Sequence, residues 1–184
     1  MIDSKEASAA LADIDDIVQR VKQSQLYELA SLAAIWWGLL VFAGNLVTWL
    51  WPVYAVYAWP AVDVVGVIGL VALRMLNPPH QPRAAGFDIR LLLVFASFFA
   101  FGTICTSVIG HFGPRQLGAF WPLYFMLFYT LAGLWFGYAF VAIGLGISAL
   151  TLIGFFWIGE AFPLWMAFVN GGGLILGGLW MRRI

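Results

Sequence analysis

The sequence predicts an all-α membrane protein: a bundle of six transmembrane helices with both termini in the cytoplasm, preceded by an amphipathic cytoplasmic helix. Composition points to a membrane, because hydrophobic residues make up 63% of the 184 positions and charged residues only 10%. Soluble domains are roughly half apolar and about a quarter charged. The lengths of the apolar segments and the positions of the basic residues then give the number of spans and their orientation.

Six segments are long and apolar enough to cross a bilayer, which takes about 20 residues in a helix. They cover 30–51, 57–76, 91–110, 118–136, 139–158 and 162–181. No charged residue marks the turn between the fourth and fifth segments, so we place it near Gly133–Gly137. The predicted domains are therefore a cytoplasmic N-terminal helix over 1–28 and a six-helix transmembrane domain over 29–184.

Basic residues set the orientation, because the cytoplasmic loops of membrane proteins carry an excess of lysine and arginine. In a six-span arrangement all but one of the nine basic residues fall on one side: Lys5, Arg20, Lys22, Arg74, Arg83, Arg90, Arg182 and Arg183. Only Arg115 falls on the other side. A five-span arrangement would separate the terminal arginine pair from the other basic residues. Both termini are therefore predicted to be cytoplasmic.

A small set of polar residues lies mainly in the outer half of the predicted bundle: Asp63, Asn45, Thr106, His111 and Asn170. An ionisable residue inside a membrane segment is a functional-site hypothesis, so these side chains are candidate ligands for a small solute or a proton. The alternative for Asp63 starts from Pro60. If this proline begins the second helix, Asp63 lies in the first turn, where the helix dipole favours a negative charge.

The N-terminal segment is predicted to be an amphipathic helix. Its apolar stripe has three- and four-residue spacing and consists of Leu11, Ile14, Val18 and Val21. Helices that bind anionic lipid surfaces are usually rich in lysine and arginine, whereas acids outnumber bases from Asp3 to Lys22. We therefore expect the stripe to bind a cytoplasmic protein partner or the same segment of a second copy. The alternatives are folding back on the basic loop between spans two and three, and disorder.

Glycine is concentrated in the last span, which contains the stretch FVNGGGLILGG. Small residues let membrane helices approach closely, and this favours tight packing of the span against its neighbours. The alternative is a helix that unwinds at the triple glycine, as in segments that line substrate sites of transporters.

The sequence lacks the motifs of common enzyme and cofactor classes. It contains no zinc-protease helix, nucleophile elbow, phosphate-binding glycine motif or paired-cysteine metal motif, and Cys105 is its single cysteine. The two histidines, His80 and His111, fall on opposite sides of the predicted membrane and cannot share a metal. Basic and acidic residues cancel, which gives no indication of nucleic-acid binding. We expect a non-enzymatic protein with no metal and no cofactor.

Three stretches carry a resemblance to known proteins: ADIDDIVQRVKQSQLYELASL, FGPRQLGAFWPLYFM and FPLWMAF. They are similar to small six-span bacterial inner-membrane proteins of uncharacterised function, and the resemblance implies that location and no catalytic or binding residue. We expect a sensory or accessory membrane module that engages a protein partner through its cytoplasmic N-terminal helix. The alternative is a small-solute transporter with an outward-facing polar site around Asp63.

Overall fold

The structure is a computed structural model of the chain, which describes residues 4–76 and 89–183. Within these residues every regular element is helical. The α-helices are α1 (Ser4–Leu50), α2 (Ala55–Leu76), α3 (Ile89–Thr103), α4 (Pro114–Phe136), α5 (Tyr138–Trp157), α6 (Phe162–Met166) and α7 (Gly173–Met181). The shorter elements are a 3-10 turn, η1 (Pro52–Tyr54), and two π-helical segments, η3 (Ile104–Ile109) and η4 (Ala167–Gly172).

Five helical segments in the described part of the chain are long and apolar enough to cross a membrane: Tyr27–Leu50, Pro52–Leu73, Pro114–Phe136, Tyr138–Trp157 and Phe162–Met181. A shorter apolar segment, Ala96–Ile109, belongs to α3 and η3. The prediction of an all-helical chain with membrane-length apolar helices is confirmed. A sixth crossing, through α3, stays a prediction.

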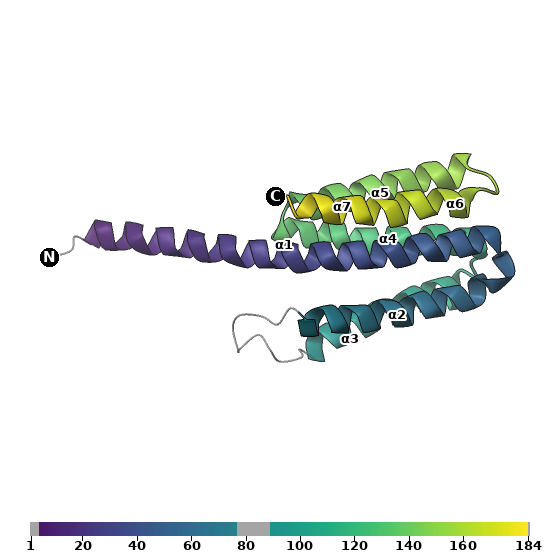
Figure 1. Ribbon diagram of the computed structural model, residues 1–184, viewed down its shortest axis with the longest axis horizontal. Helices are drawn as coiled ribbons and strands as arrows, with labels where there is room; N and C mark the ends of the chain where they lie inside the picture. The colour runs from purple at the N-terminus through teal and green to yellow at the C-terminus, as the bar shows by residue number, and fades with distance from the viewer. Residues whose placement is uncertain (1–3, 77–88, 184) are drawn as a thin grey trace.

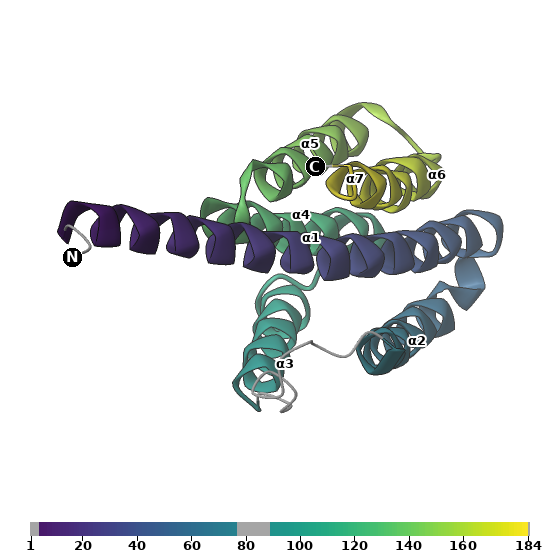
Figure 2. The ribbon, with the colours of Figure 1, turned by 60° about the vertical axis from the view of Figure 1, so that its left-hand side comes forward.

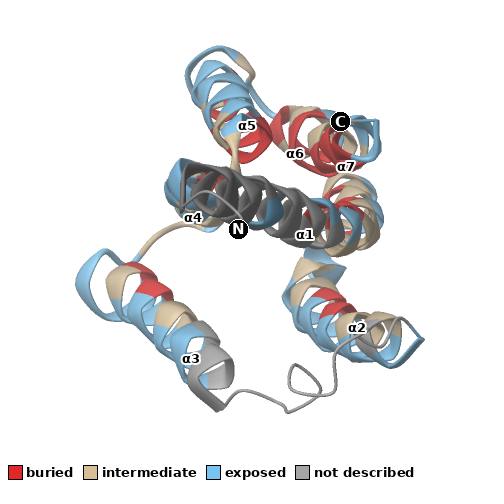
Figure 3. Ribbon diagram, turned by 90° about the vertical axis from the view of Figure 1, so that its left-hand side faces the viewer, coloured by how far each residue is buried: buried red, intermediate tan, exposed pale blue. Residues whose placement is uncertain are grey.

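The helices form two groups about α1 and α4. The α5 helix and the continuous helix α6–η4–α7 pack on one side, while α2 and α3 lie on the other side (Figures 1 and 3). Helices α2 and α3 lie apart from each other (Figures 2 and 3). The main core lies in the first group, where buried side chains from α1, α4, α5, η4 and α7 meet; among them are Tyr27, Met126, Phe140, Ile147 and Leu174. Helices α2 and α3 leave most of their surface exposed.

The first helix is one uninterrupted rod of 47 residues. Residues 4–37 contain neither glycine nor proline, so nothing in the sequence breaks the helix near the predicted boundary between residues 28 and 29. The N-terminal part of α1 extends beyond the rest of the bundle (Figures 1 and 2). The residues predicted as the N-terminal helix thus continue without a break into the first apolar span. The division into a cytoplasmic domain and a transmembrane domain stays a prediction.

A single residue, Gly137, separates α4 from α5. Its φ of 127° lies in a region that glycine adopts far more readily than other residues. The next residues begin α5 at once, and Val141 packs back against Gly133, where an added Cβ would lie 2.5 Å from a Val141 methyl carbon. The turn predicted near Gly133–Gly137 is confirmed.

Two helices begin earlier than predicted. The predicted second and fourth spans begin at residues 57 and 118, whereas α2 begins at Ala55 and α4 at Pro114. Pro60, which the alternative for Asp63 placed at the start of the second helix, lies inside α2, and Pro122 lies inside α4. Prolines occupy the first turns of η1 (Pro52), α4 (Pro114) and α6 (Pro163). At α4, the Gly113 N–H donates a hydrogen bond of 2.7 Å to the Gln116 side-chain oxygen, which satisfies a free donor at the helix start.

Candidate functional site

Glycine brings the backbone of the last span into contact with α1. A Cβ added at Gly171 would lie 2.7 Å from Phe42 Cα, and one added at Gly38 would lie 2.8 Å from the Gly171 carbonyl oxygen. Further along the same pair, a Cβ at Gly178 would lie 2.7 Å from the Ser31 carbonyl oxygen. We call Gly38, Gly171 and Gly178 the glycine seam. Because these contacts involve backbone atoms, they fix the position of the last span against α1.

The triple glycine of this span is helical rather than unwound. Gly171 and Gly172 end the π-helical segment η4, and Gly173 begins α7. A π-helical turn is usually a local bulge within an α-helix and is frequently found at functional sites. It widens the helix where the buried residues Val169 and Asn170 lie.

Two buried polar side chains, one beside Gly171 and one on α5, each hold an oxygen atom with no hydrogen-bond partner among the described residues. Asn170 in η4 is 7% exposed and Thr151 in α5 is 0% exposed, and both Asn170 Oδ1 and Thr151 Oγ1 are unpaired. An unpaired buried polar group costs about 1–3 kcal/mol. A side chain that is buried at this cost in free energy is a candidate ligand for a small polar solute.

Contacts on either side place these two residues in one layer. At one end Gly173 packs against Ile147, and at the other Gly154 packs against the Trp165 ring. Since α5 and α6–η4–α7 run antiparallel, Thr151 and Asn170 lie between the two contacts at a similar depth. We call this pair the unpaired polar layer.

Asn45, on α1, lies in the same part of the molecule. It is buried, and its Nδ2 donates a hydrogen bond of 2.9 Å to the Val41 carbonyl oxygen. Phe42, one turn earlier, contacts Gly171, the neighbour of Asn170. The structure therefore brings the predicted site residues Asn45 and Asn170 to one interface, between α1 and η4.

Thr106 and His111 lie elsewhere. Thr106, in η3, is buried, and its hydroxyl donates to the carbonyl oxygens of Gly102 (2.9 Å) and Thr103 (3.3 Å) in its own helix. His111 is exposed in the link between η3 and α4, with a φ of 47°. Both residues follow α3 in the chain, and α3 lies on the opposite side of α1 and α4 from α6 and α7 (Figure 3). Their role in a ligand site stays a prediction.

Asp63 is exposed on α2. Because α2 begins at Ala55 rather than at Pro60, the carboxylate lies eight residues into the helix, or about 12 Å at 1.5 Å per residue. The dipole acts within the first turn, so the interpretation of Asp63 as a first-turn charge is wrong. Asp63 is a charge on the outer surface of an apolar helix.

The predicted partner stripe lies on the projecting part of α1. Ile14 is 55% exposed there. The backbone at Leu11, Val18 and Val21 is helical, but their side chains lie outside those that the structure describes. The role of the stripe stays a prediction.

Arg115 has a role that the sequence did not indicate. Its guanidinium donates hydrogen bonds to the carbonyl oxygens of Phe155 (2.6 Å), Ile158 and Gly159 (2.7 Å). It also lies over the Phe155 and Phe162 rings, 5.4 and 5.0 Å from their centroids. The last carbonyls of a helix have no partner within it and attract a cation. Arg115 therefore joins the start of α4 to the turn between α5 and α6. The sequence held one signal for such a role, because Arg115 is the only basic residue on its predicted side of the membrane.

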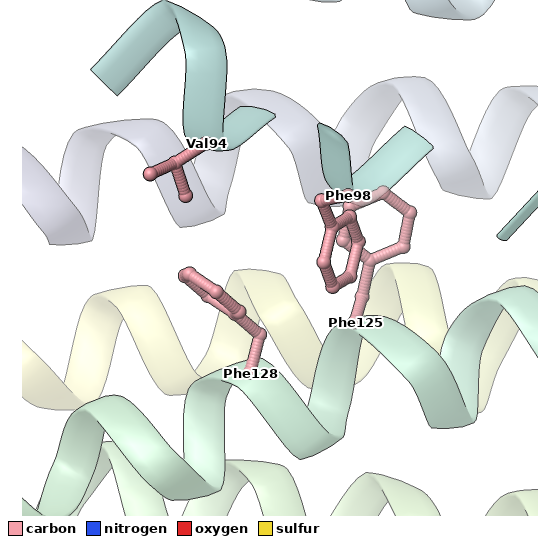
Figure 4. Close-up of a pocket in the computed structure, with 4 residues that line it drawn as sticks. All are labelled: Val94, Phe98, Phe125 and Phe128. Atoms are coloured by element: carbon pink, nitrogen blue, oxygen red, sulfur yellow. The ribbon is translucent and has the colours of Figure 1, made fainter. Parts of the chain in front are cut away.

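A cavity of about 50 Å³ lies between α3 and α4. It is lined by Val94, Phe98, Phe125 and Phe128, and all four side chains present carbon only (Figure 4). Sites for small molecules usually measure about 300–1,000 Å³ and include placed polar groups. This cavity is a gap between the aromatic rings that join α3 to α4.

No family model, curated protein or solved structure matches the chain. Within the described residues, no cluster of three or more histidine, cysteine, aspartate or glutamate side chains is placed to hold a metal ion. The resemblance to small inner-membrane proteins and the expectation of no enzymatic activity stay predictions.

Proposed function

We propose that the chain is an accessory or sensory subunit of the bacterial inner membrane, which binds a protein partner through the N-terminal part of α1 and catalyses no reaction itself. The observation that carries this proposal is the continuity of α1. A helix of 47 residues is about 70 Å long, whereas a bilayer with its headgroup regions is about 40–45 Å thick. When the apolar half of α1 spans the membrane, the other half lies in water. Its apolar stripe is then exposed to solvent unless a protein partner packs against it.

The rod also links a partner to the bundle. Gly38 of the glycine seam lies on the same helix as Ile14, with no glycine or proline between them. Movement of the projecting end therefore acts directly on the contact between α1 and η4. Such a connection suits a sensory or regulatory subunit, in which binding outside the membrane changes packing inside it.

The arrangement of the chain ends supports cytoplasmic termini. The projecting part of α1 and the C-terminus lie at the same end of the bundle (Figure 1), and the terminal arginines Arg182 and Arg183 belong to that end. Basic residues favour the cytoplasmic side. A sixth crossing is supported by length, because the 15 residues of α3 continue into the 6 of η3 and together span about 30 Å.

The test places the same negative charge on opposite faces of the projecting helix. Ile14→Glu puts a carboxylate into the stripe, and Gln23→Glu puts one about 180° around the helix at 3.6 residues per turn. Each full-length variant is purified from native membranes, and the proteins that co-purify are identified and quantified. We expect Ile14→Glu to lower partner recovery about tenfold or more, since a buried interface residue is replaced by a charge, and Gln23→Glu to retain it.

Two results separate binding from folding. The variants should elute from size-exclusion chromatography like the wild type, because Ile14 lies outside the bundle core. If Ile14→Glu keeps every partner of the wild type, or if Gln23→Glu loses the same partners, the stripe is not the binding surface and the proposal is wrong.

A further inference from the structure

We propose that the exposed face of α2 around Asp63 is a docking surface inside the membrane, and that its occupant is a transmembrane helix of a partner protein with a lysine or arginine at the depth of Asp63. This inference does not rest on the function proposed for the N-terminal part of α1. The two surfaces lie on different helices, so each can fail while the other holds.

Two measures place Asp63 below the membrane surface. Trp51, Tyr54 and Tyr57 are 57%, 60% and 73% exposed at the α1–α2 connection, and exposed tryptophan and tyrosine rings favour the headgroup level. Asp63 is six residues beyond Tyr57, or about 9 Å at 1.5 Å per residue. Its neighbour Val62 packs against Gly44, which is itself six residues before the end of α1. Both measures put the carboxylate well inside the apolar layer.

The side of α2 that meets α1 is already occupied. A Cβ at Gly66 or Gly69 would overlap the rings of Trp37 and Trp36, respectively. The Trp36 Nε1 also donates a hydrogen bond of 3.3 Å to the Gly66 carbonyl oxygen. These contacts follow one stripe of α2, and Asp63 lies outside it.

A second stripe of α2 has no cover in the described structure. Its residues recur at three- and four-residue spacing and are all exposed: Val56, Pro60, Asp63, Val67 and Val71. We call this stripe the α2 outer face. Only 6% of the apolar window of this span is buried, against 50% for the last span. The α2 outer face has the spacing that a helix presents to another helix, with Asp63 at its centre.

The charge of Asp63 distinguishes three possible occupants of the α2 outer face: lipid chains, a second copy of this protein and a helix of a different protein. Lipid chains offer no hydrogen-bond donor to a carboxylate, and charged residues in membrane helices almost always pair or face a polar interior. Arg115 is engaged by carbonyl groups at the α5–α6 turn. A second copy related by a two-fold axis would bring Asp63 against Asp63, which disfavours ionisation of both. A helix with a basic side chain supplies the opposite charge.

The experiment uses the full-length protein in phosphatidylcholine vesicles, with a donor fluorophore at its C-terminus. The probe is a synthetic leucine–alanine transmembrane peptide that carries an acceptor and one lysine about 10 Å from one end of its apolar stretch. Its control has leucine in place of the lysine. Binding is measured by energy transfer as peptide is added. Polar contacts between membrane helices contribute modestly, so we expect the lysine peptide to bind about 3- to 15-fold more tightly than the leucine peptide.

Variants of the protein test whether the α2 outer face is responsible for the preference for the lysine peptide. Asp63→Leu and Asp63→Asn should both remove it, and unchanged helical content by circular dichroism shows that they fold. Val67→Trp places a large ring one turn from Asp63 and should weaken binding of the lysine peptide. Leu152→Trp adds the same ring to an exposed position of α5 and should leave binding unchanged.

Three outcomes overturn the inference. The first is equal binding of the two peptides by the wild type, which would show that the face does not select a basic side chain. The second is a preference for lysine that persists in Asp63→Leu, which would assign the preference to another acid. The third is self-association of the protein without peptide that Asp63→Asn abolishes and the lysine peptide does not compete with, which would make a second copy the occupant.

Discussion

At the scale of single residues, two adjacent glycines of η4 have opposite surroundings. A Cβ at Gly171 would lie 2.7 Å from the backbone of Phe42, while one at Gly172 would have no atom within 4 Å. We predict that Gly171→Ala lowers the free energy of unfolding by about 1–3 kcal/mol, because the backbone of α1 must move away. Gly172→Ala should instead raise it by about 0.5–1 kcal/mol, since alanine loses less conformational freedom in a helix.

The pair is measured by unfolding in mixed micelles with increasing denaturing detergent, followed by tryptophan fluorescence. The two variants have the same composition and differ by one position, so expression and detergent effects cancel. Equal effects of the two substitutions would show that the glycine seam does not hold α1 and the last span in contact.

For Asp63, the sequence predicted that the residue is unusual but not where it lies in its helix. Its rarity in an apolar segment was enough to single it out. Its surroundings were not predictable, because they depend on where the helix begins, and α2 begins at Ala55, after the 3-10 turn at Pro52, rather than at Pro60. This earlier start moves the carboxylate from the first turn of a helix, where the dipole would stabilise it, to the surface of an apolar helix.

At the scale of elements, the interface between α5 and η4 contains the unpaired polar layer. We predict that Thr151→Val raises the free energy of unfolding by about 1 kcal/mol, because it replaces an unpaired buried hydroxyl by a methyl group of similar shape. Thr130→Val is the matched control, since the Thr130 hydroxyl donates a hydrogen bond of 2.9 Å to the Met126 carbonyl oxygen. Its removal should lower stability slightly or leave it unchanged.

The sign of the Thr151→Val effect also bears on function. A loss of stability would show that the hydroxyl has a partner in the membrane, such as a bound water or ion shared with Asn170. That result would favour a small-solute transporter over an accessory subunit, and it would move the candidate site from Asp63 to the α5–η4 interface.

The sequence predicted the boundaries of a helix well where glycine, proline or polar residues mark the ends of an apolar segment. Five membrane-length helices lie close to their predicted ranges, and the turn at Gly137 was placed by glycine alone. The continuity of α1 was missed because the boundary at residue 28 follows a change in composition, and helical hydrogen bonds do not depend on that change. The glycine seam and the Arg115 contacts could not be predicted from the sequence, because both depend on which helices contact each other in the folded protein.

At the scale of the whole molecule, α1 and α4 lie between two halves of unequal packing. On one side, α5 and α6–η4–α7 bury most of the core. On the other side, α3 is held to α4 by aromatic rings, such as the stacked pair Phe98–Tyr124 with centroids 3.9 Å apart. The apolar surface of the protein is therefore divided unequally: it is packed in the core on the side of α5 and α6–η4–α7 and largely exposed on α2, whose apolar window is only 6% buried.

The six-span topology makes a prediction that a five-span arrangement reverses. In a Cys105→Ser background, single cysteines are introduced at three exposed positions: Ser24→Cys on α1, Glu160→Cys in the α5–α6 turn and Arg183→Cys at the C-terminus. A membrane-impermeant maleimide added to intact spheroplasts should label only the cysteine at position 160. In inverted vesicles it should label the other two, because an odd number of crossings separates each of them from the turn. If α3 lies along the surface instead of crossing, positions 24 and 160 are labelled from the same side and position 183 from the opposite side. The pattern at position 183 thus tests directly whether α3 with η3 completes a sixth crossing.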